Sequence, residues 1–294
     1  MRFSGQGMMS HTATTTISRY FSNTRGKALS TGWFGLSTAE FLMPVTIIYA
    51  LTIMDWRNIW IVISVAIILF LPLVSYFLVK EVKLSSREND TEVAKENIKQ
   101  WKRSEVIKDY RFIIIALNML AMPWIATGIF VYQSFILSAK NWGEYTIAQS
   151  FMVYSIASVL TLFVAGYLID KFTSRKLLIY MNIPFLISLL ILFYFQSPVS
   201  SFFFLGLIGV SNGFANVLGS STWAELYGVK FIGSIKALTT ALMVFSTAFG
   251  TAFFGLMIDF DFSIEQISMI SAGYILISLI LLFLIKNKLN PTIL

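Results

Sequence analysis

The sequence predicts an all-α polytopic membrane protein, a bundle of about nine transmembrane helices. Of its 294 residues, 56% are hydrophobic and only 13% are charged, which is about half the charged share of a typical soluble domain. Apolar runs longer than the roughly 20 residues that cross a bilayer recur along the whole chain. A soluble fold of this length could not bury so much apolar surface. The lipid bilayer is therefore an expected partner of the chain.

Eight apolar runs are long enough to span a bilayer. They cover residues 28–53, 58–79, 111–138, 146–169, 177–196, 202–222, 235–258 and 264–285. A ninth run, residues 3–20, has helical length but is rich in Ser, Thr and Gly. Small residues let helices approach closely, so we expect this run among other helices or along a polar cavity.

Basic residues alternate between the two sides of this arrangement. Most of the 22 Lys and Arg residues fall in loops that follow the first, third, fifth, seventh and ninth runs. By the positive-inside rule that side is cytoplasmic, so the C-terminus lies inside and Met1 outside. We expect an integral protein of a bacterial-type inner membrane. A chain that begins outside without a signal peptide suggests that N-terminal spans are missing.

A charged segment at residues 81–109 separates two predicted domains. Residues 1–80 hold three runs and residues 110–294 hold six, with a solvated cytoplasmic linker between them. A short internal repeat supports this division, because RGKALSTG at residues 25–32 is similar to SIKALTTA at residues 234–241. Each copy opens a run after a basic loop. Parallel repeats of this kind would leave three helices absent before residue 1.

The sequence GYLIDKFTSRK at residues 166–176 resembles the loop motif G-x-x-x-D-R-x-G-R-R of the major facilitator superfamily. The residues that fit the motif are Gly166, Asp170, Lys171, Arg175 and Lys176. Thr173 replaces the usual Gly. In that family the second copy of the motif lies between helices eight and nine; here it lies between the fifth and sixth runs, which again implies three absent helices. Residues 223–238 resemble the connection between helices ten and eleven in monocarboxylate- or organic-anion-type members.

This resemblance implies a bundle with a partial N-terminal half, equivalent to helices four to six, and a complete six-helix C-terminal half. It implies secondary active transport of a small solute by alternating access, with an organic anion such as a monocarboxylate as the candidate solute and protons as the candidate coupling ion. Asp170 would face the start of the span near Gly233 and Lys236 and hold one access state closed. Lys171, Arg175 and Lys176 would belong to the same gate, or would only fix the orientation of the chain.

Three ionisable residues inside the runs or at the edge of one are candidates for substrate or proton binding, because charge within a bilayer is costly. Glu40 lies in the middle of a run and could carry a coupling proton, or pair permanently with a neighbouring helix. Arg2, by resemblance, would project from helix four and hold a substrate carboxylate; the alternative is an anchor at the headgroups. His11 could relay protons or be hydrogen-bonded in helix packing.

Uncharged polar residues inside the runs form a second set of candidates. Gln133, Asn212 and Asn216 would lie on the cavity wall by resemblance to the family. Asn212 and Asn216 are four residues apart and therefore share one face of a helix. The alternative for all three is hydrogen bonding between helices.

The sequence offers little for other kinds of chemistry. It has no Cys and a single His, which excludes thiolate and multi-histidine metal sites. It contains no nucleophile elbow, phosphate loop or nucleic-acid module. We therefore expect no enzymatic activity, no cofactor and no nucleic-acid partner. A truncated, non-transporting remnant and a membrane scaffold or sensor remain the alternatives to a transporter.

Overall fold

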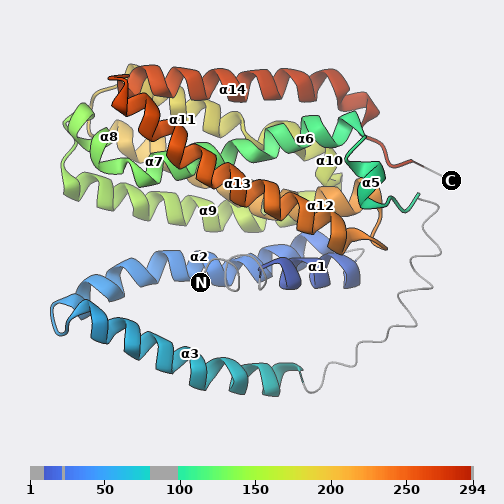
Figure 1. Ribbon diagram of the computed structural model, residues 1–294, viewed down its shortest axis with the longest axis horizontal. Helices are drawn as coiled ribbons and strands as arrows, with labels where there is room; N and C mark the ends of the chain where they lie inside the picture. Colours follow the sequence, from blue (N-terminus) through green and yellow to red (C-terminus); the bar gives the residue numbers. More distant parts are fainter. Residues whose placement is uncertain (1–9, 22–23, 80–98, 293–294) are drawn as a thin grey trace. The chain divides into compact units, whose positions relative to one another are not determined.

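The computed structural model describes residues 10–21, 24–79 and 99–292. Throughout these ranges the regular structure is helical (Figure 1). By its internal contacts the chain divides into a large unit, Met1–Gly35 with Asn97–Leu294, and a small unit, Leu36–Glu96. The division falls within one helix, and each unit is described by itself. The predicted division at the 81–109 segment stays a prediction.

The large unit contains most of the helices. They are α1 (Ser10–Tyr20), the start of α2 (Arg25–Leu51), α5 (Arg103–Val106), α6 (Tyr110–Ala121), the π-helix η2 (Met122–Ala126), α7 (Thr127–Val131), α8 (Gln133–Lys140), α9 (Glu144–Phe172), α10 (Ser174–Met181), α11 (Ile183–Tyr194), α12 (Ser200–Tyr227), α13 (Ile232–Asp259), α14 (Ile264–Ile285) and the 3-10 turn η3 (Lys286–Lys288). The small unit contains the rest of α2 and α3 (Trp56–Val79).

Seven helical segments in the described ranges are long and apolar enough to cross a membrane. They begin at Trp56, Tyr110, Gln149, Ser174, Ser200, Ile232 and Ile264. The predicted count of nine is therefore not confirmed. The run at 3–20 is described only as the 11 residues of α1. The 27-residue α2 is long enough, but its Ser and Thr residues and its ionisable groups lower its apolar character.

Two of the spanning segments are interrupted where the backbone cannot continue an α-helix. Pro123 lacks an N–H group and lies in the π-helix that joins α6 to α7. Pro184 follows the break between α10 and α11 at Asn182, whose φ and ψ are −99° and 2°. A side chain at the second break bonds to the helix that precedes the first: Asn182 Nδ2 donates to the carbonyl of Asn118 in α6 at 2.6 Å. Predicted runs 111–138 and 177–196 are therefore continuous as spans but broken as helices.

Helices α9 and α12 lie side by side at close range because α12 presents glycine to its neighbour (Figure 1). A Cβ atom placed on Gly209 would collide with the carbonyl of Tyr154, and one on Gly213 would come within 2.6 Å of the Ser158 carbonyl. Hydrogen bonds reinforce the pair, such as the 2.7 Å contact between the hydroxyls of Ser150 and Ser201. This pair forms the rigid centre of the large unit.

An ion pair closes the large unit at one end. Lys140 Nζ lies 2.7 Å from Glu265 Oε1, and the Lys140 side chain is fully buried. Gln196 Nε2 donates to the same carboxylate at 3.2 Å. The pair joins the end of α8 to the start of α14. A buried lysine without this carboxylate would be strongly unfavourable.

Candidate functional site

The opposite end of the large unit, named here the basic end, carries residues 171–176, Lys230 and residues 286–288. At this end the described parts of α1 and α2 contact α9, α12 and α13. We name the contact made by Ser18, Gly26, Asp170, Gly233 and Lys236 the basic-end contact. It brings together one residue of the loop motif and both copies of the internal repeat.

Asp170, near the end of α9, binds the start of α2. The N–H of Gly26 donates to Asp170 Oδ1 at 2.7 Å, and the N–H of Lys27 donates to Oδ2 at 3.1 Å. These N–H groups have no acceptor within their own helix, and the positive end of the helix dipole favours a carboxylate there. The carboxylate thus caps α2 from another helix.

Asp170 contacts the start of a different helix from the one that we expected. Asp170 was expected at the start of the span near Gly233 and Lys236, but it caps α2. The two copies of the repeat differ at the deciding position: Gly26 in the first copy aligns with Ile235 in the second. Only the glycine lets a helix start lie directly against α9.

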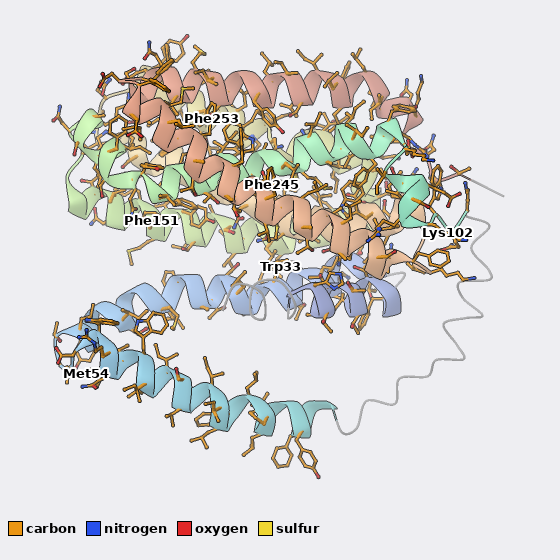
Figure 2. All side chains as sticks on the ribbon, in the orientation of Figure 1. Trp33, Met54, Lys102, Phe151, Phe245 and Phe253 are labelled. Atoms are coloured by element: carbon orange, nitrogen blue, oxygen red, sulfur yellow. The ribbon has the colours of Figure 1, made fainter. Side chains whose placement is uncertain are left out.

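Gly166 completes the close approach of α2 to α9. A Cβ on Gly166 would lie 2.7 Å from Ser30 Oγ and 2.9 Å from the carbonyl of Gly26. A Cβ on Gly26 would collide with the carbonyl of Gly166. Leu29, one turn further along α2, is fully buried against apolar residues of α9 and α12. Figure 2 shows Trp33 at the next turn of the same helix.

Thr173 stands where the motif that the loop resembles has glycine, and its backbone conformation is one that favours glycine. Its φ and ψ are 75° and 146°, a region that residues with a Cβ rarely adopt. The conformation is held by the Thr173 N–H, which donates to the carbonyl of Ile169 at 2.9 Å. It turns the chain sharply from α9 into α10, and so keeps Asp170 and Arg175 on separate helices.

The start of α13 contacts α1. His11 Nε2 lies 3.1 Å from the carbonyl of Gly233, so this nitrogen is the donor in the contact. Lys236 Nζ donates to Ser18 Oγ at 3.4 Å, and Arg25 Nε donates to the Ser18 carbonyl at 3.2 Å. Lys236 is only 5% exposed and Ser18 is fully buried. Among the described residues, Lys236 makes no salt bridge within 4 Å.

The basic residues of the loop motif have different surroundings. Arg175 Nε lies 3.6 Å from Glu225 Oε2 on α12, and Glu225 also accepts the N–H of Ser174 at 2.9 Å. Lys171 and Lys176 are exposed. Only Arg175, among these three, is built into the packing of the basic end.

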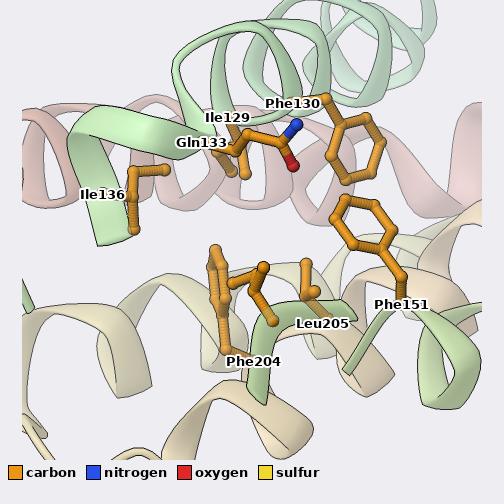
Figure 3. A pocket seen from close by; sticks show the side chains of 8 residues that line it. Ile129, Phe130, Gln133, Ile136, Phe151, Phe204 and Leu205 are labelled. Carbon is orange, nitrogen blue, oxygen red and sulfur yellow. The ribbon is translucent and has the colours of Figure 1, made fainter. Parts of the chain in front are cut away.

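Gln133 lies at a small hollow away from the basic end (Figure 3). The hollow separates α7 and α8 from α9 and α12, and its other lining residues are apolar: Ile129, Phe130, Ile136, Ile147, Phe151, Phe204 and Leu205. Figure 3 shows Gln133 and Phe130 on one side and Phe151 and Leu205 on the other. A bound group here would meet mainly hydrocarbon and one amide.

Of the remaining sequence candidates, Asn212 and Asn216 have described side chains. Asn212 Nδ2 donates to Ser158 Oγ at 3.1 Å, which is a bond between α12 and α9. Asn216 lies one turn further along α12 and is half-buried. Glu40 lies in α2, but its side chain is outside the description, and Arg2 precedes the first described residue. In the described residues, no group of three His, Asp or Glu could hold a metal ion.

Ser18, Lys236 and Glu225 take part in the basic end but were not candidates from the sequence. The repeat contained a usable signal for Lys236, because it aligns with Lys27 and both precede an apolar run. Burial of one lysine and exposure of the other depend on packing, which the repeat does not encode. Glu225 and Ser18 carry no pattern that singles them out.

Comparison with known families agrees with this architecture. The family model described as Major Facilitator Superfamily matches residues 4–251 and also residues 113–292. No curated protein sequence matches the chain. Members of this family are generally membrane transporters of small molecules. Because the first match alone spans well over half of the sequence, and the helices are apolar enough for a bilayer, the chain belongs to the major facilitator superfamily.

Proposed function

We propose that the protein is a secondary transporter that works by alternating access, and that the basic-end contact is its cytoplasmic gate, closed in this structure. The observation that carries the proposal is the cap that Asp170 places on α2. It joins the two parts that the internal repeat assigns to different halves of the transporter. Opening on this side would require the halves to separate here.

The contact has properties that suit a gate. It rests on charge–dipole bonds and on glycine-mediated packing, both of which can be broken and remade without unfolding a helix. The interface on the α2 side is narrow, since it depends on Gly26, Ser30 and Gly166. A modest change in the angle between α2 and α9 would remove both hydrogen bonds to Asp170.

For the solute we propose a small organic anion such as a monocarboxylate. Support comes from the charges at the gate, where Arg25 and Lys236 are both buried and Lys236 has no carboxylate at salt-bridge distance among the described residues. An anion that moves along this path would be attracted by both cations. Proton coupling, with Glu40 as its carrier, is part of the same proposal.

The gate can be tested by cysteine accessibility, because the chain contains no Cys. Ser18→Cys places one reporter thiol at a fully buried position in the gate. In inside-out membrane vesicles, Asp170→Asn on this background is expected to speed labelling by an impermeant maleimide by about tenfold, since hydrogen bonds to a charged group contribute about 1.5–3 kcal/mol. Asp259→Asn, at the far end of α13, is the matched control and should leave the rate unchanged. Equal rates in the two variants would rule out the gate.

Transport itself requires a second experiment. The purified protein in proteoliposomes should take up radiolabelled monocarboxylates faster when the pH gradient drives protons inward. Glu40→Gln should abolish the effect of the gradient. Uptake that is absent for every monocarboxylate tried, with and without a gradient, would end the anion proposal. Equal uptake in parent and Glu40→Gln vesicles would end the proton role of Glu40.

A further inference from the structure

The C-terminal tail is bound firmly to the basic end. Arg175 Nη1 donates to the carbonyl of Leu289 and to Asn290 Oδ1, both at 2.9 Å. Arg111 Nη1 donates to the carbonyl of Asn290 at 2.8 Å. The Leu289 side chain is only 3% exposed. Two guanidinium groups from separate helices therefore fix a short stretch that has no regular structure of its own.

The described end of the linker lies between this tail and the loop that joins α12 to α13. The N–H of Lys99 donates to the carbonyl of Thr292 at 2.8 Å on the tail side. On the other side, the N–H of Trp101 donates to the carbonyl of Tyr227 at 3.1 Å. Their rings pack edge to face with centroids 5.5 Å apart. The linker end is thus hydrogen-bonded on both sides.

Gln100 makes the most specific of these contacts. Its Oε1 accepts the N–H of Lys230 at 3.0 Å. Its side chain fills the space beside Gly228, where a Cβ would come within 2.6 Å of Gln100 Nε2. Gly228 has a φ of +80°, a backbone conformation that favours glycine. The loop is shaped to receive the amide of Gln100.

Lys99 is itself held in place by the short helix α5. Lys99 Nζ lies 2.9 Å from Glu105 Oε1 and 4.2 Å from the centre of the Trp101 ring. The pKa of Glu105 is lowered because its carboxylate accepts the N–H of Lys102 and pairs with Lys99. The carboxylate is therefore charged at neutral pH, and Lys99 remains oriented by it.

The loop that receives Gln100 leads directly into the gate. Gly233, whose carbonyl His11 contacts, is only three residues after Lys230. The buried Lys236 is six residues after Lys230. The N–H of Gly228 donates to Ala224 and the N–H of Ile232 donates to Val229. A displacement at Lys230 would therefore be transmitted to the start of α13 through a short, bonded stretch.

We propose that Gln100 is a positioning residue for the gate and that the tail, residues 289–292, is a latch that keeps Gln100 in the α12–α13 loop. With the latch bound, the loop holds Gly233 and Lys236 against α1. With the latch released, the gate opens more often. This inference rests on the proposed gate, which it extends by naming the part of the chain that regulates it.

The test uses the Ser18→Cys reporter in the full chain. Gln100→Ala removes the acceptor for Lys230 and is expected to speed labelling by about fivefold, as the loss of one neutral hydrogen bond predicts. Gln100→Glu retains an acceptor oxygen and should restore a rate within about twofold of the parent. If Gln100 had only a structural role, its variants would change the thermal stability of the protein, but the labelling rates of Gln100→Ala and Gln100→Glu would not differ.

The latch is tested by a stop codon after Lys288, which removes the residues bound by Arg175 and Arg111. This variant should label as fast as Gln100→Ala, whereas Thr292→Ala, which keeps its backbone carbonyl, should label at the parent rate. If the truncated chain does not fold, Asn290→Ala replaces it and should also speed labelling.

The latch and the gate can fail separately. The latch is overturned, and the gate is retained, if Asp170→Asn labels faster than the parent while the tail variants and Gln100→Ala label at the parent rate. A parent rate in Asp170→Asn would instead count against the gate.

Discussion

At the scale of single residues, Thr173 shows how a loop can keep its geometry after losing its usual amino acid. The sharp turn between α9 and α10 needs a positive φ, and Thr173 provides it at 75°. Its hydroxyl is also buried with no hydrogen-bond partner in the described residues. The positive φ and the unbonded hydroxyl both cost free energy. Both arise because Thr173 stands where the motif has glycine.

Thr173→Gly is therefore expected to stabilise the protein. Relief of backbone strain should exceed the entropy that glycine adds to the unfolded chain, for a net gain of about 1 kcal/mol. Thermal unfolding in detergent measures the change as a higher Tm. Thr240→Gly, two turns into α13, is the control and should lower the Tm, since glycine weakens a helix interior. A Tm at or below the parent value for Thr173→Gly would mean that the turn stores no strain.

At the scale of elements, the hydrophobic runs predicted the helices well because bilayer thickness fixes the length of a span. The breaks were less predictable. Pro123 and Pro184 indicate where an α-helix is disturbed, but whether the result is a π-helix or a full interruption depends on neighbouring helices. The small residues of the run at 3–20 predicted close packing, but did not identify α12 and α13 as the neighbours of α1.

Close packing of α9 with α12 yields an element-scale prediction. Gly209→Ala places a methyl group against the Tyr154 carbonyl, which is part of a helix backbone and cannot move alone. The expected loss is about 2 kcal/mol, typical of overpacking, and it is measured by chemical or thermal unfolding. Gly273→Ala on α14 meets nothing within 4 Å, so it should be neutral or slightly stabilising. Equal effects of the two substitutions would show that α9 and α12 are not in backbone contact.

The site shows the same division between what sequence can and cannot predict. Gly166, Asp170 and Arg175 of the loop motif make specific contacts in the structure, and their role in a gate stays a prediction. The repeat made the starts of α2 and α13 look equivalent, and only the contrast between Gly26 and Ile235 separates them. Ser18 and Glu225 acquire their roles from tertiary packing, which no short pattern in one sequence reports.

At the scale of the whole molecule, the two ends of α13 differ in charge. Lys230 and Lys236 lie near its start, and Asp259 and Asp261 lie at its end. A helix of 28 residues is about 40 Å long, enough to span a bilayer. The positive-inside rule then predicts that the basic end, with the C-terminal tail, faces the cytoplasm.

This orientation can be measured with single cysteines at exposed positions. Lys288→Cys, at the basic end, should react with an impermeant maleimide only in inside-out vesicles. Asp259→Cys should react only in right-side-out vesicles. The two variants serve as controls for each other, because vesicle leakage would label both in either preparation. The opposite pattern would invert the orientation and place the gate on the outer side.

Burial of Lys236 affects the stability of the closed arrangement. A lysine enclosed with no carboxylate at salt-bridge distance among the described residues raises the free energy of the state that encloses it. The two hydrogen bonds to Asp170 lower the free energy of that same state. If the basic-end contact is the gate that we propose, these two effects oppose each other in the closed arrangement. We then expect a carrier that leaves this arrangement readily, in exchange for a less stable closed state.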